Sequence, residues 1–331
     1  MTTIPLAELH CHIEGAALPE LVRELAHRNG QDITGLIDDD GGYVWTDFDD
    51  FLSAYDKAAS VFTRPEDYSA LAYTYAAYLS RKGAIYSETF ASTDHAERAG
   101  VNPVAYLAAL TDGIKRAEVD HGIVSRIIPT GVRHFGHDAI NRAADIAIEA
   151  AKTNASITGF GIAGSEVAGS LLDAKTAFER CAAAGLGLTA HAGEWTGPPT
   201  IRDALKLGVT RIGHGIRAAE DESLMADLVQ KGITLEVCPV SNIVLKAVES
   251  QDAHPAKKLY DAGIKLTASS DDPPHFHTNL AKDTDVMVAL LGGDERQMRA
   301  MLTRNALEAA FVDEPTRQKL LGKLDSALAS A

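Results

Sequence analysis

Amphipathic segments that end at a glycine alternate with short apolar runs along most of the chain. Six such glycines are Gly83, Gly122, Gly185, Gly208, Gly232 and Gly263, and the runs that follow them are AIYSETF, IVSRIIP, LGLTAHA, VTRIGHG, ITLEVCP and IKLTASS. A glycine can adopt the left-handed conformation that ends a helix, and an apolar run rich in β-branched residues is typical of a buried parallel strand. The alternation predicts an α/β fold with a parallel sheet.

Two further apolar runs, PLAELHC near the start and SITGFGI after Ala155, bring the number of candidate strands to eight. The segments between strands have helical periodicity, as in Leu18, Leu21, Val22 and Leu25. Eight βα units favour a closed (β/α)8 TIM barrel, with an open doubly wound sheet as the main alternative. A barrel of this length is commonly one domain, so residues 1–331 are expected to form a single unit.

Two segments depart from the βα repeat. The stretch from about residue 30 to residue 80 contains the turn cluster DDDGG and the aromatic-rich DFDDFLSAYDKAASVF. It predicts a helical insertion after the first strand, which serves either as a lid over a site or as an additional packed pair of helices. After Gly293 the pattern predicts a C-terminal helical tail that includes Ala306 to Val312.

Charge and cysteine content narrow the classes of ligand and compartment. The 31 basic and 46 acidic residues give a net charge of −15, which repels polyanions and argues against nucleic-acid binding. Three widely spaced cysteines suggest no disulfide framework, which fits a reducing compartment. The N-terminus resembles no signal peptide, and no apolar run reaches membrane-spanning length. We expect a cytoplasmic protein that binds a small molecule and no membrane.

The segment ELHCHIEG places two histidines at the end of an apolar strand. His10 and His12 are separated by one residue, so strand geometry points both imidazoles to the same face, where they can share a metal. Cys11 should point the other way and act as a small buried residue. HxH also occurs by chance, and its position at a strand end is what favours metal binding.

Two later strands also end in polar residues. In LTAHAGEW, His191 suits a third metal ligand, and Glu194 on the following turn is free to act as an acid or base. The alternative for Glu194 is a solvated loop carboxylate, which is less favoured because Gly193 beside it permits close approach of a ligand. In RIGHGIRA, His214 lies between two glycines, which leaves its ring unobstructed, although a buried core histidine would look the same.

The last strand ends in two adjacent carboxylates, Asp271 and Asp272, in LTASSDDPP. Neighbouring acids repel each other, so a cation nearby would make this arrangement favourable. A metal ligand beside a substrate-facing partner explains the pair better than a loop cap does. Three histidines and one carboxylate form a ligand set suited to Zn²⁺ with an open position for water.

The ordered motifs resemble those of the adenosine deaminase family of the amidohydrolase superfamily over nearly the whole chain. The matching segments are ELHCHIEG, GIAGSE, AHAGE, GHG, EVCPVSN and SSDDP. The resemblance implies that one Zn²⁺ is bound by His10, His12, His191 and Asp271. Binuclear members of the superfamily usually carry a bridging lysine late in the fourth strand, and ITGFGIAGSE contains none, which favours a single metal.

The resemblance also implies roles in catalysis and in substrate binding. Glu194 would protonate the purine N1, and His214 would orient the attacking water. Asp272 would hydrogen-bond N7, and the Gly164 N–H would donate to N3. The implied catalytic residues are Glu194, His214 and Asp271, and the implied substrate-binding residues are His12, Glu14, Gly164 and Asp272. A metal lowers the pKa of its bound water, which would supply a hydroxide for attack on C6 and release of ammonia.

Glu14 and the fourth motif give opposing indications about the substrate. Nucleoside deaminases of the family mostly have Asp at the position of Glu14, where it contacts the ribose, whereas Glu resembles the adenine deaminase branch. The adenine branch usually reads DSSE in the fourth motif, but this chain has AGSE and keeps Gly164. We expect adenosine and 2′-deoxyadenosine as substrates, with adenine or another N6-substituted purine as the alternative. A non-catalytic purine-binding module should have lost a key residue, and none is missing.

Overall fold

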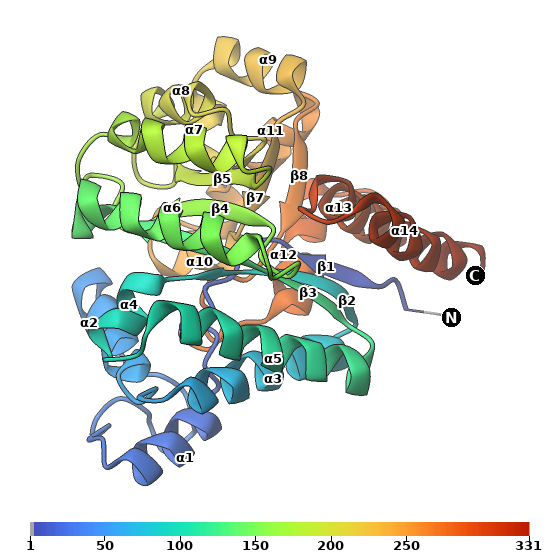
Figure 1. Cartoon of the computed structure of the whole chain (residues 1–331). Coiled ribbons are helices and arrows are strands. Elements are labelled where there is room, and N and C mark those ends of the chain that lie inside the picture. Colours follow the sequence, from blue (N-terminus) through green and yellow to red (C-terminus); the bar gives the residue numbers. More distant parts are fainter. Residues whose placement is uncertain (1–2, 331) are drawn as a thin grey trace.

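The computed structural model describes residues 3–330, and its centre is a barrel of parallel strands (Figure 1). Within these residues eight strands pair in chain order, each with the next. They are β1 (Leu6–Glu8), β2 (Ala84–Ala91), β3 (Val124–Val132), β4 (Gly159–Ala163), β5 (Gly187–Ala192), β6 (Arg211–His214), β7 (Thr234–Val237) and β8 (Lys265–Ala268). The predicted (β/α)8 TIM barrel is confirmed, and the alternative of an open sheet is wrong.

The barrel closes through the segments that follow β8 and β1. Cys11 and Asp271 form a parallel bridge. The His12 N–H donates to the Asp271 carbonyl at 3.0 Å, and the Asp271 N–H donates to the His10 carbonyl at 3.1 Å. Asp271 adopts a φ of 64°, a left-handed conformation that is uncommon for a residue other than glycine. The pairing that closes the sheet therefore places Asp271 beside both histidines.

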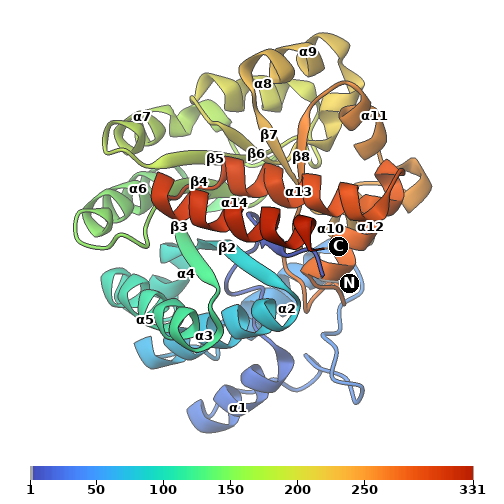
Figure 2. The same cartoon turned by 90° about the vertical axis from the view of Figure 1, so that its right-hand side faces the viewer.

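Helices surround the barrel, and the two C-terminal helices lie across one of its ends (Figures 1 and 2). They are α1 (Pro19–Asn29), α2 (Phe48–Ala59), α3 (Pro65–Arg81), α4 (Thr93–Arg98), α5 (Pro103–His121), α6 (His137–Ala151), α7 (Lys175–Ala183), α8 (Pro198–Lys206), α9 (Glu222–Lys231), α10 (Pro239–Val244), α11 (Ala256–Asp261), α12 (Leu280–Leu291), α13 (Glu295–Ala309) and α14 (Glu314–Ala329). Gly122 and Gly232 end α5 and α9 in the left-handed conformation, as the sequence pattern predicted. Among residues 3–330, no helix is long and apolar enough to cross a membrane.

Parts of the two departures from the βα repeat, α2 and the pair α13 and α14, lie at opposite ends of the barrel (Figure 1). The region from about residue 30 to residue 80 contains α2 and α3. Helix α3 packs against α5 and β2 as part of the surrounding layer, whereas α2 lies at the barrel mouth. Helices α13 and α14 lie side by side across the other end (Figure 2).

The C-terminal tail differs in one detail from its prediction. Residues 306–312 were expected to be helical, but α13 ends at Ala309. The chain turns there because Phe311 packs into the floor of the barrel, where its N–H donates to Glu88 Oε1 at 2.5 Å. The Phe311 ring lies 3.6 Å from the guanidinium carbon of Arg211.

A buried ion cluster fills the barrel beneath the mouth. Arg211 is completely buried. Its Nη2 lies 2.6 Å from Glu88 Oε2, and its Nε lies 2.6 Å from Glu236 Oε1. Arg211 Nη1 donates to the Ala309 carbonyl at 3.0 Å, and the Phe311 ring covers the guanidinium. Buried charges are tolerated only when they are paired in this way. The cluster joins the C-terminal tail to the strands that carry the candidate ligands.

We predict that Arg211→Met lowers the free energy of unfolding by about 3–5 kcal/mol, because it leaves the buried carboxylates of Glu88 and Glu236 without their cation. The control is Lys257→Met, which removes an exposed ion pair with Asp261 and should cost less than about 1 kcal/mol. Urea denaturation of both variants measures the difference. Equal costs for the two substitutions would contradict a structural role for the cluster.

Candidate active site and metal centre

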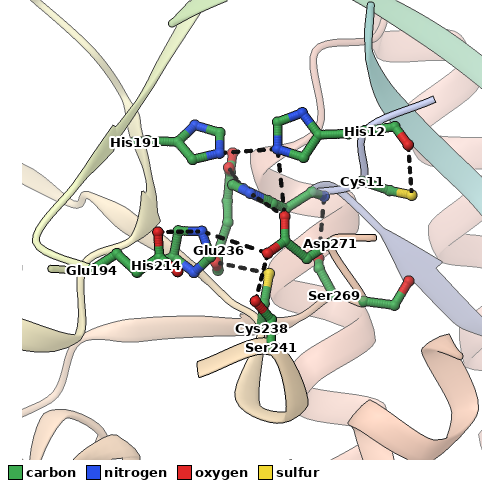
Figure 3. Close-up of polar contacts among 12 residues, drawn as sticks. Cys11, His12, His191, Glu194, His214, Glu236, Cys238, Ser241, Ser269 and Asp271 are labelled. Carbon is green, nitrogen blue, oxygen red and sulfur yellow. Dashed lines mark hydrogen bonds and ion pairs between the residues drawn. The ribbon is translucent and has the colours of Figure 1, made fainter. Parts of the chain in front are cut away.

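The four predicted ligands meet at the carboxyl ends of the strands, and three of them, His12, His191 and Asp271, are labelled in Figure 3. His12 Nε2 lies 3.1 Å from His191 Nε2 and 3.4 Å from Asp271 Oδ1. His10 Nε2 lies 3.4 Å from the same carboxylate oxygen and has no hydrogen-bond partner among the described residues, although it is completely buried. Burial lowers the pKa of His12 to about 3 and the pKa of His191 well below its usual value. The neutral rings of His12 and His191, together with His10 and the carboxylate of Asp271, form a donor set that can hold a metal ion.

The outward-facing nitrogens of two of these rings are held by acceptors. His10 Nδ1 lies 2.9 Å from Glu236 Oε2, and His191 Nδ1 lies 2.9 Å from the Ile162 carbonyl. Each Nδ1 therefore carries a hydrogen, which leaves the Nε2 lone pair for a metal. The Ser241 hydroxyl donates to Asp271 Oδ2 at 2.6 Å and leaves Oδ1 facing the histidines. The donor set and its supporting bonds fit a metal of the zinc type.

His214 lies at the edge of this cluster. Its Nε2 is 3.6 Å from Glu194 Oε2 and 4.0 Å from Asp271 Oδ2 (Figure 3). By distance alone, His214 groups with His10, His191 and Asp271 as a second possible ligand set, in place of His12. Its Nδ1, however, faces the side-chain amide nitrogen of Asn242 at 3.0 Å. This partner differs from the acceptors that hold His10 and His191.

Two buried carboxyl groups have a free oxygen at the site. Among the described residues, neither Glu194 Oε1 nor Asp272 Oδ1 has a hydrogen-bond partner. Burial, and then the charges of Asp271 and Glu166, raise the pKa of Glu194 well above its usual value. Burial and the charge of Asp271 likewise raise the pKa of Asp272. Both groups can hold a proton near neutral pH, and both residues line the cavity.

Glu166 fixes the turn that carries Glu194. One of its oxygens accepts from the Glu194 N–H at 3.1 Å. The other accepts from the Trp195 N–H at 3.1 Å, the Thr196 N–H at 2.8 Å and the Thr196 hydroxyl at 2.6 Å. A carboxylate that accepts several backbone N–H groups holds a loop in one conformation.

A cavity of about 420 Å³ lies above these residues. Helix α2 contributes Phe48, Leu52 and Tyr55 to its wall. Gly164 also lines it with a φ of 85°, and a Cβ atom there would lie 2.9 Å from His134 Nδ1. A side chain at position 164 would therefore collide with His134, so this part of the cavity wall requires glycine.

Glu14 does not line the cavity among the described residues, although it was expected to bind substrate. It is buried, its carboxylate accepts from the Tyr106 hydroxyl, and it also bonds with Tyr55, whose ring faces the cavity. Burial raises the pKa of Glu14 to about 7. Glu14 therefore lies behind the cavity wall.

The motifs, the barrel and the convergent site agree with the comparisons with known proteins. The sequence model described as adenosine deaminase matches residues 5–327. The chain belongs to the adenosine deaminase family. It is therefore a deaminase of the amidohydrolase type.

Individual members of the adenosine deaminase family show how similar the chain is to known proteins. A protein from Chelativorans sp. (strain BNC1) named adenine deaminase is 50% identical over 319 residues, which cover 96% of this chain and 97% of that protein. Other relatives with 45% to 48% identity bear the same name. The crystal structure of adenine deaminase from Arthrobacter aurescens has a TM-score of 0.90 and 28% identity, and the match covers 99% of this chain and 100% of that one.

A second solved structure, an amidohydrolase from Burkholderia ambifaria with bound Zn, has a TM-score of 0.86 and 24% identity. The match covers 99% of this chain and 92% of that one. At this level of identity the likeness shows that the two proteins share the fold.

The expectation that adenosine is the substrate is wrong. The relatives with 45% to 50% identity are named adenine deaminases, and so is the Arthrobacter protein. The expectation rested on Gly164 in the AGSE motif. A backbone N–H directed at the purine ring can serve a free base as well as a nucleoside, so this glycine does not report whether a sugar is present.

The sequence did not reveal several residues that hydrogen-bond the predicted site residues and hold them in place. Glu166, Glu236, Ser241 and Asn242 lay within motifs that were recognised but were given no role. One feature of the sequence could have identified such a residue: a charged residue inside an apolar run, as with Glu236 in ITLEVCP. A charge that faces a barrel interior needs a partner, and here the partners are His10 and Arg211.

We predict that Glu166→Gln lowers kcat by roughly 10- to 100-fold while the metal content stays unchanged, because an amide cannot accept all four bonds that hold the Glu194 turn. Glu179→Gln makes the same chemical change on exposed helix α7 and is the control. Steady-state kinetics and metal analysis of both variants measure the effect. Wild-type kcat in Glu166→Gln would contradict the positioning role.

Proposed function

We propose that this protein is an adenine deaminase that hydrolyses adenine to hypoxanthine and ammonia. The observation that carries the chemistry is Glu194, a buried carboxyl group with a raised pKa and a free oxygen on the cavity, beside a cluster that can hold a metal. A neutral carboxyl group at this place can deliver a proton to a ring nitrogen. The choice of adenine is supported by relatives of that name with up to 50% identity over almost the whole chain.

His10, His12, His191 and Asp271 would hold one Zn²⁺ per chain. When bound, this ion activates water for attack on C6 of the purine. The ligand set is supported by the partnerless Nε2 of His10 and by the Nδ1 bonds that leave the Nε2 atoms of His10 and His191 free.

The remaining residues of the site transfer a proton, orient the attacking water or orient the purine base. Glu194 gives its proton to N1, which makes C6 more electrophilic. His214 faces Glu194 and Asp271 and orients the attacking water. Asp272 holds its proton and hydrogen-bonds N7, and the Gly164 N–H donates to N3. Water adds its oxygen to C6, the bond from C6 to N6 breaks, and N6 leaves as ammonia.

The surroundings of Glu14 support a free base as the substrate. In nucleoside deaminases of the family an acid at this position contacts the sugar. Here the Glu14 carboxylate is enclosed by Tyr106 and Tyr55, and Tyr55 lies between it and the cavity. A sugar would therefore meet the phenol ring and not a free carboxylate, which leaves its hydroxyl groups without the expected partner.

We predict that kcat/KM for adenine exceeds kcat/KM for adenosine by at least about 100-fold, because the site lacks an accessible partner for the sugar. Ultraviolet assays of zinc-loaded protein with both substrates measure the ratio. Removal of the metal with a chelator should abolish turnover, and Zn²⁺ should restore it. Preference for adenosine, or no turnover of adenine by metal-replete protein, would refute the proposal.

We predict that Glu194→Gln lowers kcat by about 10²- to 10⁴-fold, because the amide keeps the shape of the carboxyl group but cannot give up a proton. Metal content and the affinity for hypoxanthine should stay within a few-fold of wild type. Glu220→Gln, at an exposed carboxylate, is the matched control. Calorimetry and steady-state kinetics test the assignment, which fails if Glu194→Gln turns over adenine at the wild-type rate.

A further inference from the structure

A buried chain of hydrogen bonds runs from a backbone N–H to His214. The Ala256 N–H faces His254 Nδ1 at 3.2 Å, and His254 Nε2 faces Asn242 Oδ1 at 3.3 Å. Asn242 Nδ2 then faces His214 Nδ1 at 3.0 Å. His254, Asn242 and His214 are all buried, with exposed fractions of 5%, 0% and 1%. Water is therefore excluded as a competing partner along the chain.

The direction of every bond in this chain is fixed by its first member. A backbone N–H can only donate, so His254 Nδ1 must accept and the neutral ring carries its hydrogen on Nε2. That hydrogen is donated to Asn242 Oδ1, which turns the amide so that its NH₂ group points at His214. His214 Nδ1 must then accept, and the neutral His214 ring carries its hydrogen on Nε2.

His10 and His191 have the opposite arrangement. A carboxylate and a carbonyl accept from their Nδ1 atoms, so their Nε2 atoms carry lone pairs. Figure 3 shows His214 beside Glu194 and Asp271, where a lone pair on Nε2 could compete for a metal. The hydrogen on His214 Nε2 removes that lone pair.

We infer that Asn242, oriented by His254, is a positioning residue that keeps the hydrogen of His214 on Nε2. In this tautomer His214 stays off the metal and donates a hydrogen bond into the cavity, toward the oxygen that attacks the purine. The catalytic role of the His214 N–H rests on the proposed function, but the tautomer of His214 can be observed without substrate.

Asn242→Asp tests the inference with almost no change of shape. A carboxylate can only accept, so His214 Nδ1 must take a hydrogen whether its ring is neutral or charged. In ¹⁵N-histidine-labelled, zinc-loaded protein, the Nδ1 shift of His214 should move from that of an unprotonated nitrogen to that of an N–H. We expect kcat for adenine to fall by about 10²- to 10⁴-fold with less than a threefold change in KM, because the wrong tautomer removes the donor.

Two further variants separate tautomer control from general damage. Asn154→Asp makes the same change at a partly buried amide that bonds Thr111, away from the site, and should leave kcat and the His214 signal unchanged. His254→Gln can still donate to Asn242 and should keep at least a third of kcat, whereas His254→Leu cannot and should lose at least tenfold.

The inference is overturned if wild-type His214 carries its hydrogen on Nδ1. It is also overturned if Asn242→Asp leaves both the Nδ1 shift and kcat unchanged. If adenine is not turned over by the wild type, the proposed function fails, but the shift of the Nδ1 signal still decides whether Asn242 sets the tautomer. The ¹⁵N signals of His214 are assigned as those that disappear from the spectrum of the His214→Gln variant.

Discussion

The site depends on the way in which the barrel closes. The sheet is completed by backbone hydrogen bonds that join His10 and His12 to Asp271, at the residues whose side chains converge. Closure and assembly of the candidate metal site are therefore one event, since strands that were out of register would separate the side chains of the site as well as the backbone groups. The left-handed backbone of Asp271 is a local cost that this closure imposes.

A second constraint comes from the floor of the barrel. Glu236 bonds His10 with one oxygen and Arg211 with the other, and Arg211 is covered by the ring of Phe311. The orientation of His10 is thus tied to the C-terminal tail through two buried charged groups. In a closed barrel the interior is packed with side chains, so a change at the floor can reach the mouth without movement of the strands.

The sequence predicted most of the fold because its signals are local. An apolar run after a glycine identifies each strand by itself, and the ends of parallel strands meet at one edge, so His10, His191 and Asp271 could be expected to lie together. The details that were not predicted depend on distant contacts. Glu14 looked available to substrate because nothing near it in sequence reveals that Tyr55 and Tyr106 enclose it.

The end of α13 was misjudged for the same reason. Helical propensity continues past Ala309, but the chain turns so that Phe311 can cover Arg211, which lies 100 residues earlier in the sequence. The substrate class was misjudged because the contact proposed for the fourth motif is with the purine ring, which adenine and adenosine share. Local motifs identify the chemistry, whereas the packing of distant segments decides which molecule has room beside it.

The crowding of carboxyl groups at the mouth explains how one site can hold both the proposed metal ligand Asp271 and the proposed proton donor Glu194. The close approach of His10 to one carboxylate oxygen, together with the nearby His214 and His12, keeps the pKa of Asp271 below its usual range in spite of its burial. The resulting negative charge adds to burial in raising the pKa of Glu194 and of Asp272. Carboxyl groups in one cavity are thus pushed in opposite directions, which is how acid and ligand roles are separated at a single pH. Burial and the negative charge of Asp271 together favour the protonated form of Glu194.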